Sequence, residues 1–564
     1  MSDRLSVAPQ VAALVAEGRR LLDAGMAADA IDLLSRARAG APGDADGARW
    51  LAEAHLAAGS SADAAQVLDA ALERAPHDAA LIVLRSETAL RQNALAESEA
   101  ILDAAIGAAP DDAALLAQRA RTHLLAGEPA AGMAALERSL ALDASNLEAQ
   151  SLRIVLATYD PAITTERLKA LQRGWPAPQP QAAPFDPVPR GDRPLRVGYV
   201  CCAFYRHPTA QVAAAVLLNH DPAQVETYCY SGSRRRDPVS LKFRMAAKGW
   251  RTITGLSDVA AAAQIRADGI DILVDLDGHF PHNRLGVFAR RAAPVQVSAW
   301  GYVPGPGLTA FDYLLTDAVV APAAETGLFP ERIVRLACAQ PYDPDLMPRP
   351  ATSGEPPAHG PGGPIRFGCF NRLDKLTDET LSLWGGVLRA APGASLTLKD
   401  RFFAEPARQA RIATGLVRAG ASRDQLRFEA GESHGGYMAA FDRIDVALDP
   451  LPVSGGVTTL DGLMQGVPAI TLAGAAPSAR ITASILAHAG VADGVCATRE
   501  AYGRTAASLA ADPARLAALR ERTLAARERF SAGAMRSYAA EVEAAYAEMW
   551  DRHLAEARAL QSSR

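Results

Sequence analysis

Residues 445–468 read DVALDPLPVSGGVTTLDGLMQGVP, and this stretch decides the fold class of the chain. The apolar run DVALD is typical of a buried strand, and a glycine-containing turn separates it from a helical pattern. From residue 195 onward, similar runs such as LRVGYV, IDILVDLDG and PVQVSAW alternate with helical segments. Such alternation indicates βαβ units built around mostly parallel sheets.

Two segments rich in proline and glycine divide the chain. Residues 175–194 and 349–363 have the composition of interdomain linkers. They bound one Rossmann-like domain at 195–348 and a second at 364–564, which ends in helices. Ligands of open α/β sheets bind at the carboxyl ends of the strands, so the loops that follow strands are the candidates for a site.

Residues 1–174 are predicted to form helical repeats, because their pattern recurs with a period of 34. The turn column of this pattern consists of Gly25, Gly59, Asn93 and Gly127. Glycine and asparagine tolerate the left-handed turn that joins two helices, and a 34-residue helix–turn–helix is the tetratricopeptide signature. Such repeats usually bind peptides or partner proteins. A short set can instead hold a homodimer together, and the sequence leaves both alternatives open.

Composition and charge argue against several classes of protein. The 564 residues carry a formal net charge of −5, so no basic field favours nucleic acid or anionic membrane. No stretch approaches the roughly 18 apolar residues of a membrane span. The six cysteines lack zinc-site spacing, and the spacing of Asp275 and Asp277 recurs elsewhere by chance. We therefore expect a cytoplasmic protein with no metal, no cofactor, no nucleic acid and no membrane partner.

The glycine-containing turn before the last quoted helix has the features of a phosphate site. Ser454, Gly455 and Gly456 let the backbone approach a ligand closely, and Thr458 and Thr459 lie where a helix start leaves N–H groups free. Free N–H groups and the helix dipole together bind phosphate. This segment is therefore predicted to hold a diphosphate.

Asp461 lies one turn into the same helix, and two interpretations fit it equally well. It can close a capping box with Thr458. It can instead bind ribose hydroxyls, as acidic residues do in many nucleotide-binding folds.

Lys375 lies just before a helix in FNRLDKLTDETL, residues 370–381. Only five of the 58 basic residues are lysines, so each lysine is a departure from the usual cation of this chain. An ammonium at this helix start would suit a diphosphate leaving group, whereas the alternative is a solvated side chain.

Two histidines also follow predicted strands of the first Rossmann-like domain. His207 precedes Pro208, which suits a first helical position, and a helix N-terminus keeps imidazole neutral. A neutral His207 can accept a proton, although a helix cap is the commoner role for a lone histidine. His279 follows the strand in IDILVDLDGHF and can face the same side of the sheet.

Together these segments resemble the tetratricopeptide-containing O-linked N-acetylglucosamine transferase family, including SPINDLY-type protein O-fucosyltransferases. The resemblance runs from about residue 195 to the end, on LRVGYV with His207-Pro208, GHFPHNRLGVFARRAAPVQVSAWGY, FNRLDK and the segment quoted first. It implies an α/β fold with N-terminal all-α repeats: a tetratricopeptide superhelix and two Rossmann-like domains in the GT-B architecture. It also implies a glycosyltransferase that needs no metal.

The resemblance assigns roles to individual positions. By resemblance, His207 and Lys375 are the catalytic residues: His207 acts as a base or positions the acceptor, and Lys375 neutralises the leaving diphosphate. The implied nucleotide-sugar-binding set is His279, Arg372, Tyr437, Ser454, Gly455, Gly456, Val457, Thr458, Thr459 and Asp461.

This sequence departs from the family at several of its characteristic positions. Ala203 stands where an aspartate is frequent, and Tyr437 where a base-stacking histidine is usual, although tyrosine also stacks on bases. Pro304-Gly305-Pro306-Gly307 replaces a turn that contains Thr or Ser.

We expect inverting transfer of N-acetylglucosamine from UDP-N-acetylglucosamine to Ser or Thr hydroxyls of proteins that the repeats recognise. Protein O-fucosylation from GDP-fucose is the alternative within the same class, and a non-catalytic nucleotide-binding scaffold is the alternative outside it.

Overall fold

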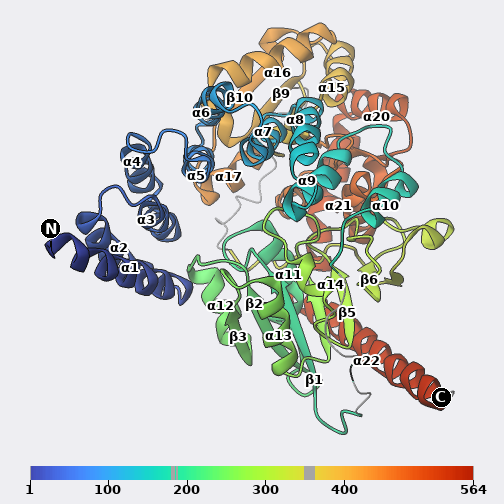
Figure 1. The fold of residues 1–564 in the computed structure, drawn as a ribbon. Coiled ribbons are helices and arrows are strands. Elements are labelled where there is room, and N and C mark those ends of the chain that lie inside the picture. The colour runs from blue at the N-terminus through green and yellow to red at the C-terminus, as the bar shows by residue number, and fades with distance from the viewer. Residues whose placement is uncertain (1, 179–184, 186–188, 348–362, 563–564) are drawn as a thin grey trace.

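The computed structural model describes residues 2–178, 185, 189–347 and 363–562. Most of the predicted linker at 349–363, and residues 179–184 and 186–188 of the other, therefore lie outside the described residues. A helical repeat region precedes two α/β domains (Figure 1). Within the described ranges, no helix combines the length and the apolarity that crossing a membrane requires.

The repeat region consists of antiparallel helix pairs. Its helices are α1 (Ser2–Asp23), α2 (Ala27–Gly40), α3 (Ala45–Ala57), α4 (Ser61–Leu72), α5 (Ala79–Arg91), α6 (Leu95–Ala108), α7 (Ala113–Leu125), α8 (Pro129–Leu142), α9 (Leu147–Ala157) and α10 (Thr165–Arg173). The predicted turn column is confirmed, because Gly25, Gly59, Asn93 and Gly127 have φ values of 74°, 86°, 63° and 75°. Each adopts the left-handed conformation that glycine and asparagine tolerate best.

The first α/β domain is built on a parallel sheet in the order β3-β2-β1-β4-β5-β6-β7. Its strands are β1 (Leu195–Cys201), β2 (Val225–Ser231), β3 (Gly249–Thr252), β4 (Ile272–Asp275), β5 (Val295–Ala299), β6 (Tyr313–Thr316) and β7 (Arg332–Arg335). Its helices are α11 (Pro208–Leu217), α12 (Pro238–Ala246), α13 (Asp258–Ala267) and α14 (Leu285–Ala289). The order around β1 is that of doubly wound nucleotide-binding sheets.

The second α/β domain repeats this plan in the order β10-β9-β8-β11-β12-β13. Its strands are β8 (Arg366–Cys369), β9 (Ser395–Lys399), β10 (Leu426–Glu429), β11 (Val446–Leu448), β12 (Ala469–Leu472) and β13 (Val495–Cys496). Its helices are α15 (Asp378–Ala390), α16 (Pro406–Arg418), α17 (His434–Ala440), α18 (Val457–Met464), α19 (Ile481–Ala489), α20 (Arg499–Ala511) and α21 (Pro513–Ala525). The predicted fold class of repeats followed by two Rossmann-like domains is confirmed.

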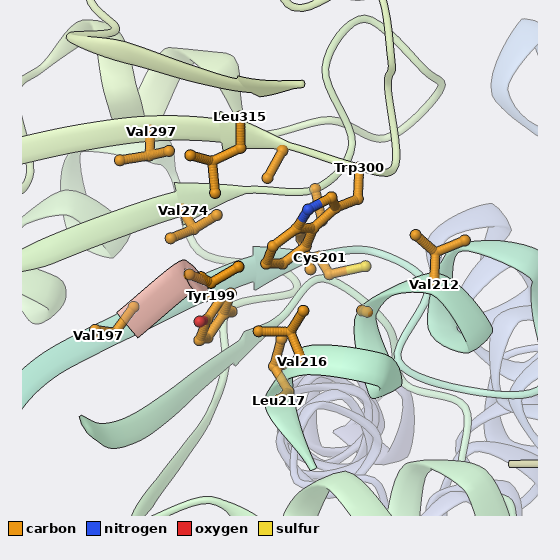
Figure 2. Packing of buried hydrophobic residues seen from close by; sticks show 14 of the residues in the cluster. Val197, Tyr199, Cys201, Val212, Val216, Leu217, Val274, Val297, Trp300 and Leu315 are labelled. Carbon is orange, nitrogen blue, oxygen red and sulfur yellow. The ribbon is translucent and has the colours of Figure 1, made fainter. Parts of the chain in front are cut away.

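The core of the first domain lies between its sheet and flanking helices. Val197, Val274 and Val297 come from neighbouring strands, and each has 0% of its surface exposed. Figure 2 shows these valines beside Val216 of α11 and the ring of Trp300. Strands of a parallel sheet that helices cover on both faces are apolar throughout, which explains the uninterrupted hydrophobic runs of the sequence.

The long last helix, α22 (Ala532–Ser562), packs on the first domain although it follows the second in the chain (Figure 1). The Tyr546 hydroxyl lies 3.2 Å from that of Tyr199 on β1, and the Trp300 indole donates to the Tyr538 hydroxyl at 3.2 Å. The sequence assigns the terminal helices to the second domain. The apolar stripe of α22 instead completes the core of the first domain, and the helix ties the two domains together.

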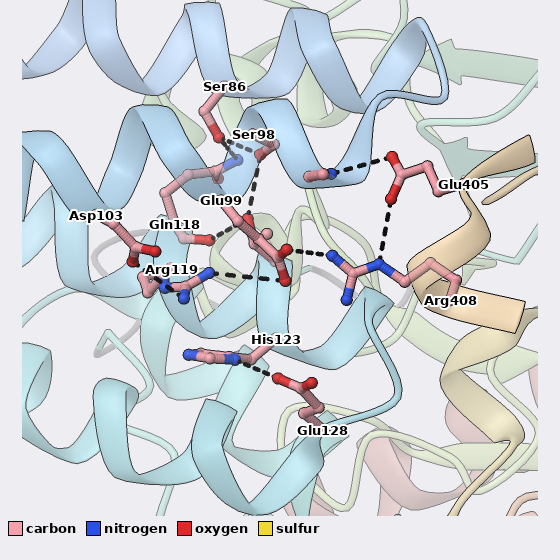
Figure 3. Close-up of polar contacts among 12 residues, drawn as sticks. Ser86, Ser98, Glu99, Asp103, Gln118, Arg119, His123, Glu128, Glu405 and Arg408 are labelled. Atoms are coloured by element: carbon pink, nitrogen blue, oxygen red, sulfur yellow. Dashed lines mark hydrogen bonds and ion pairs between the residues drawn. The ribbon is translucent and has the colours of Figure 1, made fainter. Parts of the chain in front are cut away.

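The repeats also dock on the second domain. The Arg408 guanidinium on α16 pairs with Glu99 of α6 and, at 3.2 Å, with Glu405 (Figure 3). Glu405 in turn accepts the backbone N–H of Ala96 at 3.0 Å. The Arg408 side chain is only 10% exposed, so its charge depends on these carboxylates.

The turn of the fourth repeat lies against the loop that carries Lys375. A Cβ atom placed on Gly127 would come within 2.9 Å of the Leu373 carbonyl oxygen and 2.5 Å of the Arg411 guanidinium. A Cβ on Gly59, which occupies the same column two repeats earlier, would meet nothing within 4 Å. Glycine at position 127 is therefore required by the docking as well as by the turn.

These two glycines make a matched pair of substitutions. Gly59→Ala carries only the cost of a left-handed alanine, about 1–2 kcal/mol, whereas Gly127→Ala adds the clash with Leu373. We expect Gly127→Ala to lower the thermal midpoint further and to speed amide hydrogen exchange in residues 372–376. Equal effects of the two substitutions on both measurements would contradict the docking.

Candidate active site

The predicted phosphate segment forms a strand–turn–helix unit at the carboxyl end of β11. The first backbone hydrogen bonds of α18 run from Thr459 and Leu460 to the Gly456 carbonyl, at 2.9 and 3.1 Å. Within the described part of the chain, the N–H groups of Val457 and Thr458 have no acceptor. The start of α18 therefore offers the N–H donors that an anion needs.

The turn before α18 is held rigidly by buried groups. Asp449 accepts the N–H of Gly455 at 2.7 Å, and the hydroxyl of Ser454 donates to the Ser478 carbonyl at 3.0 Å. A Cβ on Gly455 would lie 2.4 Å from the Thr459 hydroxyl. The Ser454 side chain thus stabilises the turn, and the close packing explains the glycine at 455.

Lys375 points into this turn. It ends the short 3-10 helix η2 (Leu373–Lys375), and its Nζ donates to the Ser454 carbonyl at 2.6 Å and to Asn371 Oδ1 at 3.4 Å. Desolvation lowers the pKa of Lys375, and the neighbouring Arg372 lowers it further. The structure thus brings Lys375 and the glycine-containing turn together, as their predicted roles require.

Arg372 links this loop to the repeats. Its guanidinium contacts both carboxylate oxygens of Asp374, at 3.2 and 2.7 Å. Asp374 is 2% exposed and also accepts the hydroxyl of Tyr159 at 2.7 Å. Tyr159 lies between α9 and α10, so the end of the repeat region orients Arg372 through a buried carboxylate. The Arg372 side chain itself remains 65% exposed.

His207 approaches the same arginine from the first domain. It caps α11, and its Nδ1 accepts the Thr209 N–H at 3.2 Å. A neutral imidazole that accepts at Nδ1 carries its proton on Nε2, which is then a donor. Burial, and then repulsion by Arg372 and Arg235, lowers the pKa of His207 to about 4. His207 is therefore neutral at neutral pH, and its Nε2–H has no acceptor within the described part of the chain.

Asp461 and Tyr437 contact each other. Asp461 is 4% exposed and accepts the hydroxyls of Tyr437 at 3.0 Å and of Tyr342 at 2.5 Å. Among the residues that the structure describes, no side chain caps the start of α18, so the capping box with Thr458, one of the two interpretations of Asp461, is not formed. The Tyr437 ring packs against Phe441, with ring centroids 5.5 Å apart.

His279 lies apart from this group. It is 1% exposed, its Nε2 donates to the Pro306 carbonyl at 2.8 Å, and its Nδ1 lies 3.3 Å from the Ser151 hydroxyl of α9. Burial lowers the pKa of His279 to about 4. The side chain thus fastens the repeats to the first domain, with no contact to His207 or Lys375 among the described residues.

Two further features lie outside the predicted site. A surface cavity of about 550 Å³ between α19 and α22 is lined by residues including His488, Met535 and Tyr538, and contains none of the predicted site residues. Asp275 and Asp277 are buried and accept backbone N–H groups. No cluster of three metal-ligating side chains occurs among the residues that were described.

Sequence reasoning missed Tyr159, Asp374 and Arg235. Asp374 is the neighbour of a predicted residue, and Arg235 belongs to a run of three arginines, so both left a weak signal. Tyr159 left none, because it lies beyond the repeat columns and reaches the site only through the fold.

Comparison with known proteins places the chain in a family. The model of glycosyl transferase family 41 matches residues 152–339 and 358–542, and a tetratricopeptide repeat model matches residues 21–86. The chain is 31% identical over 432 residues to a rice (Oryza sativa subsp. japonica) protein named probable UDP-N-acetylglucosamine–peptide N-acetylglucosaminyltransferase SPINDLY. That match covers 74% of this chain and 46% of the relative.

A solved structure is similar over nearly the whole chain. A mutant of the Thermobaculum terrenum O-GlcNAc transferase has 31% identity and a TM-score of 0.83, covering 90% of this chain and 98% of that one. A Caenorhabditis elegans UDP-N-acetylglucosamine–peptide N-acetylglucosaminyltransferase is 35% identical over 150 residues, 26% of this chain and 13% of the relative. This chain spans about half the length of the plant relatives it matches. The chain belongs to glycosyl transferase family 41, with tetratricopeptide repeats in front of two Rossmann-like domains.

Proposed function

We propose that this chain transfers N-acetylglucosamine from UDP-N-acetylglucosamine to Ser or Thr hydroxyls of proteins, with inversion at the anomeric carbon and without a metal. The observation that carries the proposal is that Arg372 acts electrostatically on both His207 and Lys375, while Lys375 Nζ contacts the turn that leads into α18. The names of the plant, nematode and bacterial relatives support this donor and acceptor.

The second domain supplies the groups that stabilise the departing diphosphate. The N–H groups of Val457 and Thr458 and the Lys375 ammonium face the same turn. Positive charge and N–H donors placed where negative charge develops stabilise the transition state more than the ground state. Lys375 donates to the Ser454 carbonyl in this structure. We infer that its ammonium donates to the diphosphate instead when the nucleotide sugar binds.

The first domain supplies the group that orients the acceptor. Because Nδ1 of His207 is engaged by Thr209, its Nε2–H is the atom available to the acceptor hydroxyl oxygen. In the proposed reaction that oxygen forms a bond to the anomeric carbon, the bond to the diphosphate breaks on the opposite face, and the hydroxyl proton passes to water. His207 thus acts by orientation rather than as a base.

The donor test compares nucleotides and variants directly. Calorimetry with UDP, GDP and uridine, on wild type, Lys375→Ala and the exposed control Lys248→Ala, should show preference for UDP. Lys375→Ala should weaken UDP binding by about tenfold or more and leave uridine binding unchanged, because the ammonium contacts only phosphate. Mass spectrometry of an acceptor incubated with UDP-N-acetylglucosamine or GDP-fucose then identifies the transferred sugar.

Either donor outcome is informative. Tighter GDP binding together with transfer of a deoxyhexose would replace the proposal by O-fucosylation. Absence of nucleotide binding by the wild-type protein would refute the donor site.

Two substitutions of His207 distinguish an orienting role from that of a base. A glutamine places an amide N–H near the position of Nε2, so His207→Gln should keep about a tenth of the wild-type kcat/KM for the acceptor. His207→Ala removes the donor and should lose about 10²–10³-fold, the size of a lost positioned hydrogen bond. Equal and complete loss in both variants would show that His207 is the base instead.

The pH dependence follows from the low pKa of His207. Protonated Nδ1 cannot accept the Thr209 N–H, so activity should fall only as the pH approaches 4 and stay level from pH 5 to 7. Arg235→Gln removes a charge that repels the imidazolium, which raises the pKa of His207. The fall in activity at acidic pH should therefore begin at a higher pH in this variant. The kcat/KM profile would contradict the account if wild type titrated near 6.5.

A further inference from the structure

Together with His207, five arginine side chains form a ring of electrostatic neighbours, and the reaction proposed above uses only one of these arginines. Three parts of the molecule contribute. The members of this arginine ring are Arg91 at the end of α5, Arg121 on α7, Arg235 between β2 and α12, Arg372 before η2, and Arg401 at the start of η3 (Arg401–Ala404).

The ring is defined by which charges lie near one another. Arg91 is repelled by both Arg235 and Arg121, and Arg401 by both Arg121 and Arg372. The sequence of neighbours therefore runs from the first domain through the repeats to the second domain.

His207 completes the ring between its two remaining members. Arg235 and Arg372 both act on the imidazole electrostatically. Arg235 also lies over the ring of Tyr205, 4.8 Å from its centroid, and that ring is 5.7 Å from the His207 ring. Arg235 and Arg372 therefore lie beside the group that we propose orients the acceptor.

Carboxylates offset only part of this charge. Glu87 pairs with Arg121 at 2.6 Å and also attracts Arg91, and Asp374 pairs with Arg372 at 2.7 Å. Asp400, the carboxylate beside Arg401, accepts two backbone N–H groups.

Arg91 and Arg235 are left over. Neither makes an ion pair within the described residues, and both are exposed to solvent. Arg372 lies beside Lys375, so the diphosphate of the donor accounts for that side of the ring. Arg91 belongs to the repeats, and Arg235 lies over Tyr205 beside His207, the group that we propose orients the acceptor.

We propose that the acceptor is an acidic segment, whose Asp or Glu side chains flank the modified Ser or Thr and pair with Arg91 and Arg235. This inference rests on the proposed function for the identity of the reaction, but the binding itself does not require turnover. Arginine suits the role because its planar guanidinium binds a carboxylate through two parallel hydrogen bonds. The exposed position of both side chains allows a peptide to reach them without rearrangement of the core.

The test measures peptide binding to the full-length protein, with and without UDP. Three fluorescent peptides of equal length carry one serine flanked by Asp and Glu, by Asn and Gln, or by Lys and Arg. Fluorescence anisotropy should show the acidic peptide binding about tenfold tighter than the neutral one, and the basic peptide weakest. Raising the salt concentration should narrow these differences.

A charge-reversal variant tests the residues themselves. Arg91→Glu with Arg235→Glu should abolish or invert the preference. The control Arg36→Glu makes the same kind of change on the exposed face of α2, outside the ring, and should leave the preference intact. Equal binding of the three peptides to wild type would overturn the proposal, as would an unchanged preference in the double variant.

The outcome is separable from that of the proposed function. A preference for the acidic peptide in a protein that transfers no sugar would refute the function and keep the arginine ring as a binding site. Transfer of sugar to neutral and acidic peptides with equal kcat/KM would support the proposed function and refute the arginine ring as a site for acidic peptides.

Discussion

The ion pair between Arg372 and the buried Asp374 is the interaction on which the rest of the site depends. Asp374 receives the Tyr159 hydroxyl from the repeat region, so the carboxylate has partners from two parts of the molecule. Arg372 in turn acts on Lys375 in its own domain and on His207 in the first domain. The Asp374 carboxylate is 2% exposed, whereas the Arg372 guanidinium is 65% exposed. The buried carboxylate therefore fixes the position of a solvent-exposed positive charge.

This arrangement follows from the topology of the two sheets. Both domains place their first strand in the interior of a parallel sheet, and the loops after β1 and β8 carry His207 and Lys375. Since α22 returns to the first domain and α16 binds the repeats, the three parts are held together by both ends of the chain. The repeats are therefore part of the site, because they orient Arg372 and contribute Arg91 and Arg121 to the arginine ring.

The features that the sequence predicted correctly are those that depend on residues close together in the chain. The left-handed turns at Gly25, Gly59, Asn93 and Gly127 and the glycine turn before α18 depend on nearby residues, so a pattern of fixed spacing reveals them. The scarcity of lysine also carried information. Lys169 and Lys399 are buried, Lys375 is partly buried, and all three donate to carbonyl oxygens. Partners far apart in the chain left no such signal. Three such contacts are Tyr159 with Asp374, α22 with the first sheet, and His279 with the Pro306 carbonyl. They arise from tertiary packing, which no local sequence pattern encodes.

A crystal structure of the full-length protein with UDP tests the central claim most directly, because it locates the diphosphate relative to all three parts. The account predicts the diphosphate at the start of α18, bound by the N–H groups of Val457 and Thr458. It also predicts that Lys375 Nζ leaves the Ser454 carbonyl for a phosphate oxygen, while Arg372 stays on Asp374. UDP bound elsewhere, or a Lys375 that keeps its carbonyl contact in the complex, would contradict it.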